Sequence, residues 1–526
     1  MRPIQNKISA LLKTPHTAAF AAGALAVLAF APFALSPIAI LSLATLFWLW
    51  SSASPKQAFQ LGWLFGVGLL GFGVSWLHIS IDKFGGVGFA LAVIITLLFV
   101  LALGLFFGLA GWFCAKIGPT HSTVRLLVIY PAIWVLVEWV RGWFLGGFPW
   151  LSLGYAQLDT SLQGFAPVLG VFGVSWVVAL LAGSLVLVLK GLPLPLIVRS
   201  ELDASPGVLR PVLLIVLMSS IWLLGGLLES HSWTEEAGKP LKVSMIQANI
   251  PQELKWKPEQ FEPTIDLYVG LTKANWESDL IIWPETAIPA FFHQVEQELL
   301  NPLEAEAKAN NTDLLIGIAV HNRDDKRYFN AMVSLGQQRD AYYKRHLVPF
   351  GEFLPLKWLL DPLITFLKIP MSDFSAGEKD KSLLHVAGYP AGISICYEDA
   401  FGEEVIQSLP DAAFLINASN DAWFGDSLAP HQHLEIARMR ALETERYLLR
   451  ATNTGVSAVI GPHGEIQGLS PAFKTDVLTR DITPLRGMTP YARVGNWGIV
   501  SIALLLLGIG IVLTRRGNTN TKTSII

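Results

Sequence analysis

Cysteine is nearly absent from this chain of 526 residues, which contains only Cys114 and Cys396. The second cysteine ends the β-branched run in ISICYEDAF and is followed at once by Tyr397, Glu398 and Asp399. Two cysteines do not make a disulfide framework, so the meaning of a thiol beside two acids depends on the compartment in which Cys396 lies.

Charge is also scarce. Charged residues make up 15% of the chain and hydrophobic residues 52%, whereas soluble domains have about 25% charged residues. The chain is therefore not expected to be wholly soluble. A formal net charge of −3, without a basic stripe interleaved with aromatic residues, gives no indication of a nucleic-acid partner.

Long apolar runs account for this composition. A helix needs about 20 apolar residues to cross the hydrocarbon core of a bilayer. Residues 14–55 carry no charge and are long enough for two spans, separated at the prolines of APFALSP. The other predicted spans are 61–79, 87–114, 126–139, 165–189, 212–228 and 497–513, which gives about eight. Glu138 and Arg141 interrupt the end of the fifth span.

The distribution of lysine and arginine predicts the orientation, because these residues collect in cytoplasmic loops. They lie before the first predicted span, in alternate loops and after the last span, at Arg2, Lys7, Lys13, Lys56, Lys116, Arg125, Lys190, Arg199, Arg210, Arg515, Arg516 and Lys522. We therefore predict that both termini are cytoplasmic and that seven crossings place residues 231–490 on the opposite side. The first span has no convincing cleavage site and should be retained.

Residues 231–490 have the texture of a globular domain. Apolar runs typical of buried strands, such as LKVSMIQANI, DLIIWPET and AGISICYED, alternate with helical patterns such as HQHLEIARMRALETER. This alternation predicts an α/β layered domain with both sheet faces covered. The predicted organisation is a transmembrane domain of seven helices in 1–230, an outer domain in 231–490, and a last span with a cytoplasmic tail in 491–526.

The predicted topology separates the two cysteines. Cys396 lies on the outer, oxidising side and Cys114 at the cytoplasmic end of the fourth span, so the two cannot pair. A lone outer thiol is either a buried structural cysteine or a nucleophile. The residues at the ends of the other predicted strands bear on this choice.

Ionisable residues follow two of these strands. Glu285 comes after Pro284, which should end its strand, and Lys344 and Glu352 lie in YYKRHLVPFGEFLP. Functional groups collect at strand ends in open α/β sheets. A carboxylate can take the thiol proton, and a lysine ammonium can lower the thiol pKa and stabilise an oxyanion. These groups would suffice for acyl transfer with Cys396; alternatively, Glu285 caps a helix and the other two are solvated.

Several motifs resemble known families. WPET, the lysine before HLVPFGEFLP, and ICYED resemble the Glu-Lys-Cys triad motifs of the nitrilase superfamily. A larger set resembles the apolipoprotein N-acyltransferase family of the bacterial inner membrane, and includes NIPQELKW, IIWPETAIP, NDAWFGDSLAPHQH, ARMRALE and TPYARVGNW. The membrane stretch EWVRGWFLGGFPWLSLGY also resembles this family, so the likeness covers essentially the whole chain.

The resemblance implies a nitrilase-like αββα sandwich, on the periplasmic side, joined to a polytopic helical membrane domain. It implies ping-pong transfer of a fatty acyl chain from a phospholipid, typically phosphatidylethanolamine, to the N-terminal amine of the S-diacylglyceryl cysteine of an apolipoprotein. No metal or diffusible cofactor is implied. His431 and His433 in APHQH lack a matching set of further ligands, and we expect them in a polar loop or a helix cap.

The resemblance also implies roles for individual residues. Cys396 would be the nucleophile that forms a thioester, Glu285 the general base and Lys344 the oxyanion stabiliser. Residues expected to support this triad or to contact substrate are Trp256, Glu352, Tyr397, Glu398, Asn420 and Trp423.

Two other functions remain open. A membrane-tethered amidase of the nitrilase type would keep the triad but use water or a small amine. A transporter with an outer domain is the alternative from another class, although transporters usually carry ionisable groups at mid-bilayer and the predicted spans are nearly free of them.

The segment 353–371, FLPLKWLLDPLITFLKIPM, is an apolar stretch directly after Glu352. Its three prolines divide it into short pieces, which favours an irregular arm over the alternative of a core helix. A soluble domain rarely exposes so much apolar surface without a use. We predict that Trp358 and Phe366 help this arm to enter the outer leaflet and control access of lipid.

Overall fold

The structure is a computed structural model that describes residues 14–117, 122–191, 209–354, 358, 374–379 and 381–523, with side chains up to residue 513. The chain divides into two compact units. The helical unit comprises Met1–Ser75, Val93–His231 and Asn496–Ile526, and the sandwich unit comprises Trp76–Ala92 and Ser232–Gly495. The domain boundaries predicted above do not foresee that Trp76–Ala92 clusters with the sandwich, and they stay a prediction.

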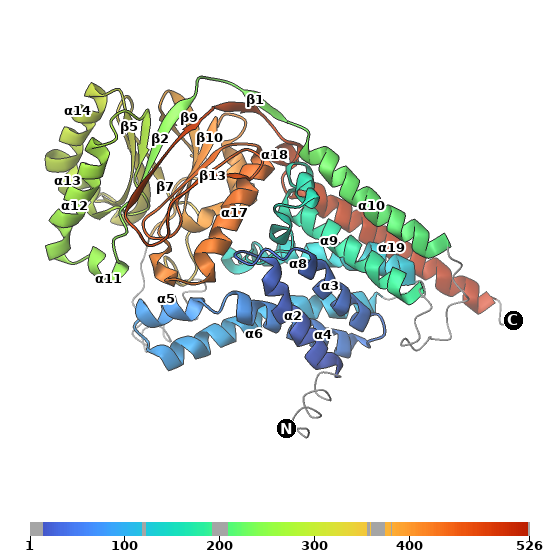
Figure 1. Ribbon diagram of the computed structural model, residues 1–526. Coiled ribbons are helices and arrows are strands. Elements are labelled where there is room, and N and C mark those ends of the chain that lie inside the picture. Colours follow the sequence, from blue (N-terminus) through green and yellow to red (C-terminus); the bar gives the residue numbers. More distant parts are fainter. Residues whose placement is uncertain are drawn as a thin grey trace, which may run out of the picture. The chain divides into compact units, whose positions relative to one another are not determined.

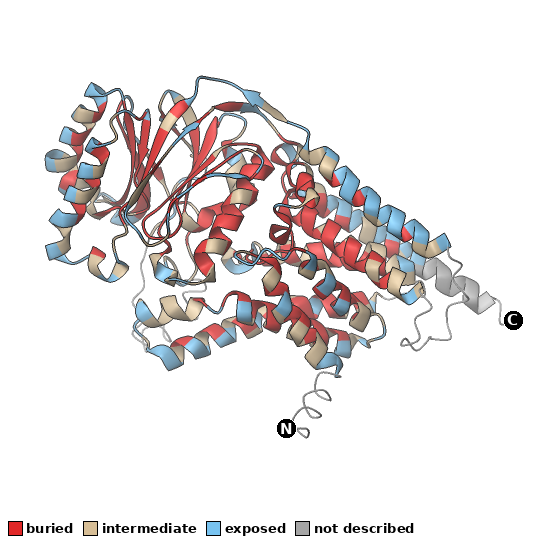
Figure 2. Ribbon diagram, viewed as in Figure 1, coloured by how far each residue is buried: buried red, intermediate tan, exposed pale blue. Residues whose placement is uncertain are grey.

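One long helix of the helical unit is much more buried than the others (Figure 2). The main helices of the unit are α2 (Pro15–Ala26), α3 (Pro37–Trp50), α4 (Pro55–Gly73), α6 (Phe89–Lys116), α7 (Ser122–Val124), α8 (Tyr130–Arg141), α9 (Ala166–Gly191), α10 (Leu209–Glu229) and α19 (Trp497–Thr523). Short turns are η1 (Val27–Ala29), η2 (Arg125–Ile129), η3 (Phe144–Gly146), η4 (Tyr155–Gln157) and η5 (Ser161–Phe165). Helix α9 contacts α3, α8, α10 and α19, and it is the most buried of the long apolar helices.

Local sequence determines where these helices begin and how closely they pack. Pro55 begins α4, where its missing N–H costs nothing, and the Ser54 hydroxyl accepts the backbone N–H of Gln57. Within α4, a side chain at Gly68 would place its Cβ 2.3 Å from the Phe20 carbonyl oxygen of α2. Glycine therefore permits the close approach of α2 and α4.

Helices lie at all eight predicted spans. In the described residues, Phe89–Lys116, Ser122–Arg141, Ser161–Gly191 and Leu209–Glu229 are long and apolar enough to cross a membrane. Helix α4 and the short helix α5 (Leu77–Lys83) would together make a fifth, but they are bent by 57° where the sequence predicted one continuous span. Pro15–Ala29, Pro37–Trp50 and Trp497–Leu513 are apolar but shorter, so the number of crossings stays a prediction.

The sandwich unit contains two large sheets. One has the order β14-β2-β3-β5-β6-β7 with β4 beside β5, and the other has the order β13-β12-β11-β10-β9-β8. The first consists of β2 (Leu241–Gln247), β3 (Leu280–Ile282), β4 (Ile288–Phe291), β5 (Asp313–Asn322), β6 (Arg327–Leu335), β7 (Asp340–Tyr343) and β14 (Asp476–Ile482). The second consists of β8 (Leu383–Val386), β9 (Tyr389–Ile395), β10 (Phe414–Ser419), β11 (Leu448–Thr452), β12 (Ala458–Ile460) and β13 (Ile466–Leu469). A small pair, β1 (Thr234–Glu236) and β15 (Leu485–Gly487), is separate.

Helices cover the outer faces of both sheets, so the unit has four layers (Figure 1). On the first sheet these are α12 (Pro258–Lys273), α13 (Phe292–Val295), η6 (Glu296–Leu300) and α14 (Asn301–Ala309), and on the second the main one is α17 (Leu428–Thr444). Shorter elements are α11 (Gln252–Lys255), η7 (Cys396–Ala400), α16 (Gly402–Val405), η8 (Ile406–Ser408), η9 (Asp421–Phe424) and α18 (Pro490–Val494).

Between the sheets lies an apolar core to which Met245 and Ile282 contribute from one side and Ile395 and Ile416 from the other. Figure 2 shows the strands of both sheets as largely buried. The predicted αββα sandwich is confirmed. The strands predicted from LKVSMIQANI, DLIIWPET and AGISICYED are β2, β3 and β9.

The apolar arm predicted at 353–371 lies almost entirely outside the described residues. Of its members, Phe353, Leu354 and Trp358 are described, and Trp358 is 79% exposed. The prediction for the remainder of the arm, including Phe366, is not addressed by the described residues.

Candidate active site

The three residues predicted as a triad each stand at the end of a strand. Cys396 directly follows β9, Lys344 directly follows β7, and Glu285 lies just beyond β3. Strands β3 and β5 are parallel, and β7 runs in the direction of β5 because both pair antiparallel with β6. The carboxyl ends of these strands therefore lie at one edge of their sheet, which is where functional groups collect in α/β folds.

Lys344 lies between two carboxylates and is 1% exposed. Its Nζ donates a hydrogen bond of 2.9 Å to Glu352 Oε1 and lies 3.7 Å from Glu285 Oε1. Burial alone would lower the pKa of Lys344, but the charges of Glu352 and Glu285 outweigh burial and raise it above its usual value. Lys344 is therefore a buried ammonium at neutral pH, and neither it nor Glu352 is solvated.

Cys396 is partly exposed at the first position of η7, where its φ is +52°. Loss of hydration on burial raises the pKa of the thiol, the negative charge of Glu285 raises it further, and Lys344 opposes both. Lys344 thus lowers the thiol pKa as expected, but burial and Glu285 together raise it by more. The resting group is therefore a thiol, and it would need a base to remove its proton if it served as the predicted nucleophile.

Asn330, which the sequence analysis did not single out, bridges the two carboxylates. It is buried on β6, and its Nδ2 donates to Glu285 Oε1 at 2.7 Å and to Glu352 Oε1 at 3.4 Å. The only signal in the sequence is an amide inside the apolar run FNAMVSLG. Asn330 fixes the carboxylate of Glu285 and contributes no charge of its own.

Lys255 was also missed, and it supports the turn that carries Glu285. Its Nζ donates to the Glu285 backbone oxygen at 3.4 Å, and its side chain is buried. Burial lowers the pKa of Lys255 to about 8, while the Glu285 charge opposes that change. The next residue, Thr286, has φ of +48°, a rare conformation for a β-branched residue, and this turn therefore needs external support.

Glu398 ties together the segments that carry Cys396 and Lys344. Its carboxylate accepts the backbone N–H groups of Ile395, Arg345 and His346 at 2.6, 2.6 and 3.0 Å, and the Tyr342 hydroxyl at 2.8 Å. Burial raises the pKa of Glu398 against the effect of these donors. Glu398 therefore holds the segments around Cys396 and Lys344 together, because its partners are backbone N–H groups and the Tyr342 hydroxyl.

The remaining predicted residues divide into exposed and inward-facing groups. Trp256 and Trp423 are 55% and 36% exposed, so both are open to a ligand. Asn420 is buried and donates to Gln252 Oε1 at 2.8 Å. Tyr397 is also buried, and its ring packs against Phe401 with a centroid separation of 5.1 Å.

The prediction for His433 was wrong about its place in the fold. It lies inside α17, whose N-cap is Ser427, and it is buried, so it occupies neither a polar loop nor a helix cap. The same prediction was wrong for His431, which also lies inside α17 and is partly exposed. In the described ranges, no group of three or more His, Cys, Asp or Glu side chains is arranged to hold a metal ion.

Comparisons with known proteins cover both units. Residues 22–184 match the apolipoprotein N-acyltransferase N-terminal domain, and residues 242–490 match the carbon-nitrogen hydrolase family. The chain is 46% identical over 499 residues to an apolipoprotein N-acyltransferase of Methylococcus capsulatus, with 95% of this chain and 96% of that protein covered. It is 42% identical over 511 residues to one of Nitrosomonas europaea, with 96% and 98% covered.

Among solved structures, a carbon-nitrogen hydrolase from Helicobacter pylori matches 46% of this chain and 89% of its own, with a TM-score of 0.35 and 16% identity.

Proposed function

Because this chain belongs to the apolipoprotein N-acyltransferase family, we propose that it completes lipoproteins by moving a fatty acyl chain from a phospholipid to a protein amine. The donor class is a membrane phospholipid, with phosphatidylethanolamine as the expected head group. The acceptor is the N-terminal amine of an apolipoprotein whose first cysteine carries an S-diacylglyceryl group. The reaction proceeds in two halves through a thioester.

In the first half, the sulfur of Cys396 attacks the ester carbonyl of the phospholipid while Glu285 takes the thiol proton. Lys344 stabilises the oxyanion of the tetrahedral intermediate, and one such donor contributes about 2.7–4 kcal/mol to a transition state. Glu285 then returns the proton to the departing glycerol oxygen. A lysophospholipid leaves, and the acyl chain remains on the sulfur as a thioester.

In the second half, the acceptor amine attacks the thioester and forms an amide. Glu285 takes a proton from the amine and passes it to the departing sulfur of Cys396, which restores the thiol. Lys344 again stabilises the oxyanion. The balance requires no metal and no cofactor, since each half only exchanges an acyl group and one proton.

The observation that carries this proposal is the charge arrangement at the strand ends. Lys344 is held as an ammonium by Glu285 and Glu352 within 3.7 Å, and the Cys396 thiol senses the charges of both Glu285 and Lys344. A proton acceptor, an oxyanion donor and a nucleophile thus lie within electrostatic reach of one another. Exposed Trp256 and Trp423 supply apolar surface for lipid.

The cellular setting is part of the proposal. The long apolar helices make the chain a membrane protein, and both substrates reside in a bilayer. We place the chain in the bacterial inner membrane, with the sandwich unit in the periplasm and both termini in the cytoplasm, because the lysine and arginine residues lie in alternate loops. The arm 353–371 would admit the lipids.

The direct test is the mass of Cys396 after incubation with phosphatidylethanolamine. The full-length protein in detergent should gain one acyl group on the peptide that contains Cys396, and Cys396→Ala should gain none. Cys114→Ala is the matched control, since it removes the other thiol, which is buried in the helical unit, and it should acylate normally.

A second step separates the two enzymatic alternatives. A diacylglyceryl lipopeptide should discharge the thioester and acquire the acyl chain as an amide. Discharge to water or a small amine at the same rate would favour an amidase instead. The proposed mechanism would be refuted if Cys396 acquired no acyl group, or if Cys396→Ala still transferred the acyl chain to the lipopeptide.

A further inference from the structure

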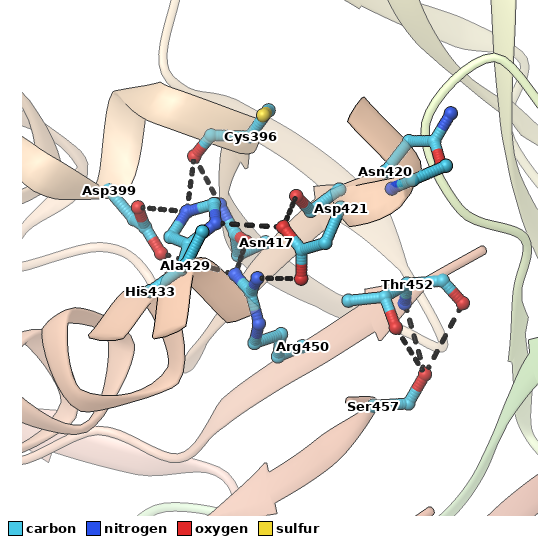
Figure 3. A network of polar contacts seen from close by, with 12 residues as sticks. Cys396, Asp399, Asn417, Asn420, Asp421, Ala429, His433, Arg450, Thr452 and Ser457 are labelled. Carbon is cyan, nitrogen blue, oxygen red and sulfur yellow. Dashed lines mark hydrogen bonds and ion pairs between the residues drawn. The ribbon is translucent and has the colours of Figure 1, made fainter. Parts of the chain in front are cut away.

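A cluster of charged side chains is buried beside the Cys396 backbone and has no part in the triad (Figure 3). His433 comes from α17, Asp399 from η7, Asp421 from η9 and Arg450 from β11, and none is more than 3% exposed. Four separate elements, three of them consecutive in the chain, thus place two acids and two bases in one cluster.

His433 is hydrogen-bonded at both ring nitrogens. Nδ1 lies 3.0 Å from Asp421 Oδ1, and Nε2 lies 2.9 Å from Asp399 Oδ1. Nε2 is also 3.3 Å from the backbone oxygen of Cys396. All three partners accept hydrogen bonds, so a neutral ring, with one N–H, would direct a lone pair at one carboxylate.

The geometry therefore calls for an imidazolium. Burial and the positive charge of Arg450 lower the pKa of His433, but the two carboxylates outweigh them and raise it to about 9. Arg450 and His433 likewise outweigh burial at Asp421 and hold the pKa of that carboxyl below its usual value. At neutral pH the cluster consists of two carboxylates, one imidazolium and one guanidinium.

The charges of the cluster then sum to zero. Arg450 donates to Asp421 Oδ2 at 2.9 Å and lies 3.6 Å from Asp399 Oδ2, so each acid faces both bases. If His433 were neutral, the cluster would keep one net negative charge within electrostatic reach of the thiol. Asp421 already contributes to the raised pKa of the Cys396 thiol, and an unbalanced charge would raise that pKa further.

The cluster also holds the backbone of Cys396. The φ of +52° is uncommon for a residue with a side chain. The Cys396 carbonyl accepts from Asn417 Nδ2 at 3.1 Å and faces His433 Nε2, and Arg450 in turn donates to Asn417 Oδ1 at 2.7 Å. The same groups that balance the charge therefore hold the Cys396 carbonyl in this backbone conformation.

We propose that His433 is a positioning residue for acyl transfer: as a buried imidazolium it holds the Cys396 carbonyl and cancels a negative charge of the cluster that would otherwise act on the thiol, so that the sulfur can gain negative charge during attack and departure. This inference rests on the proposed role of Cys396. His433 keeps its protons throughout, and no atom passes between it and the substrate.

A charge-compensation experiment separates this role from simple support of the fold. His433→Gln leaves one excess negative charge, and adding Asp399→Asn removes it while the Arg450–Asp421 pair remains. The thiol pKa is read from the rate of Cys396 alkylation by iodoacetamide against pH, in the full-length protein in detergent. This readout needs no lipid substrate, so it fails or succeeds independently of the acyl-transfer proposal.

We expect His433→Gln to raise the thiol pKa by about one unit, which slows alkylation about tenfold at a fixed pH below the pKa. The kcat for acyl transfer should fall by a similar factor. The double variant should recover most of both losses, although it has lost two hydrogen-bonding groups. Asp399→Asn alone should lower the thiol pKa. His431→Gln, on the same helix but outside the cluster, should match the wild type.

The pH dependence gives a further readout. A raised pKa means that the contribution of the imidazolium is present at neutral pH and is lost as pH rises through about 9. Wild-type acyl transfer should fall across that range, and His433→Gln should lack this step.

An unchanged thiol pKa in folded His433→Gln would overturn the proposal, as would a double variant no better than the single one. Should His433→Gln fail to fold, Asp399→Asn decides: a thiol pKa equal to that of the wild type would refute the charge balance.

Discussion

Cys396 and Lys344 respond in opposite ways to the same buried surroundings. Burial favours the neutral form of each. Two carboxylates lie within 3.7 Å of Lys344 and keep it charged. At Cys396, burial and the charge of Glu285 both raise the thiol pKa, and Lys344 lowers it by less. The resting site is thus an ammonium beside a protonated thiol. In the proposed mechanism, the base must therefore take the proton during the attack and not before it.

Asn330 should matter most for that proton transfer. Its amide donates to Glu285 at 2.7 Å, and a hydrogen bond to a charged group contributes about 1.5–3 kcal/mol. We expect Asn330→Ala to lower the rate of thioester formation by at least about tenfold, with little change in KM, because Glu285 would lose its orientation.

A rapid-quench measurement of acyl–Cys396 formation provides the check. Asn310→Ala, an exposed amide at the end of α14, is the control and should react as the wild type does. Equal rates for Asn330→Ala and the wild type would show that Glu285 needs no such support.

Single residues also show what the sequence could and could not predict. Cys396, Glu285 and Lys344 could be singled out because each lies in a motif that resembles the nitrilase superfamily, and the motifs of Cys396 and Glu285 also end apolar runs. Asn330 and His433 acquire their partners only through folding: Asn330 meets a carboxylate 45 positions away and His433 one 34 positions away. No local pattern encodes such contacts, so both were missed or misplaced.

At the scale of elements, a helix from the apolar half of the sequence belongs to the sandwich unit. The ring of Trp76, just before α5, lies 4.7 Å from that of Phe424, and the ring of Phe84, just after α5, lies 4.8 Å from that of Trp423. Trp76 Nε1 also donates to Gln432 of α17 at 3.1 Å. Helix α5 thereby secures η9, the turn that begins with Asp421.

Removing the Phe84–Trp423 ring contact should make the η9 turn more mobile. An edge-to-face aromatic pair contributes about 0.5–1.5 kcal/mol, so Phe84→Ala should raise amide hydrogen exchange in residues 421–425 by about two- to tenfold. The exposed Trp423 would lose its orientation, and KM for the lipid acceptor should rise. Alkylation of Cys396 should change little, since Phe84 makes no charged contact.

Phe89→Ala is the matched control, because Phe89 is 64% exposed at the start of α6 and its ring meets that of His78 instead. Exchange mass spectrometry of both variants compares the two directly. Equal protection of 421–425 in Phe84→Ala and the wild type would mean that α5 does not secure the turn.

The elements show the same division between predictable and unpredictable features. Buried strands such as β2 and β9 were recognisable as short apolar runs, and α17 as a helical pattern, because such patterns are local in the sequence. The bend between α4 and α5 was not predicted, since an unbroken apolar run contains no signal for it. The contact of α5 with η9 joins positions more than 330 apart, and hydropathy carries no information about such pairs.

At the scale of the whole molecule, the side on which the sandwich unit lies depends on whether the number of crossings is odd or even. Between Lys56 and Glu229 the described helices give four segments long enough to cross, and the bent α4–α5 pair would be a fifth. Five crossings place the two positions on opposite sides of the membrane, and four place them on the same side. The shorter helices α2 and α3 precede Lys56 and do not alter this comparison.

Reporter fusions truncated after Lys56 and after Glu229 decide between these counts. We expect a cytoplasmic reporter to be active only at Lys56 and a periplasmic reporter only at Glu229, because alternate loops carry the positive charge. A fusion after Lys116 tests the bent pair directly: it should behave like Lys56 if α4–α5 crosses, and lie on the opposite side if α4–α5 turns back. The same side for Lys56 and Glu229 would mean that α4–α5 turns back within the membrane. Cys396 would then face the compartment of Lys56, where the acceptor amine of an exported lipoprotein could not reach it.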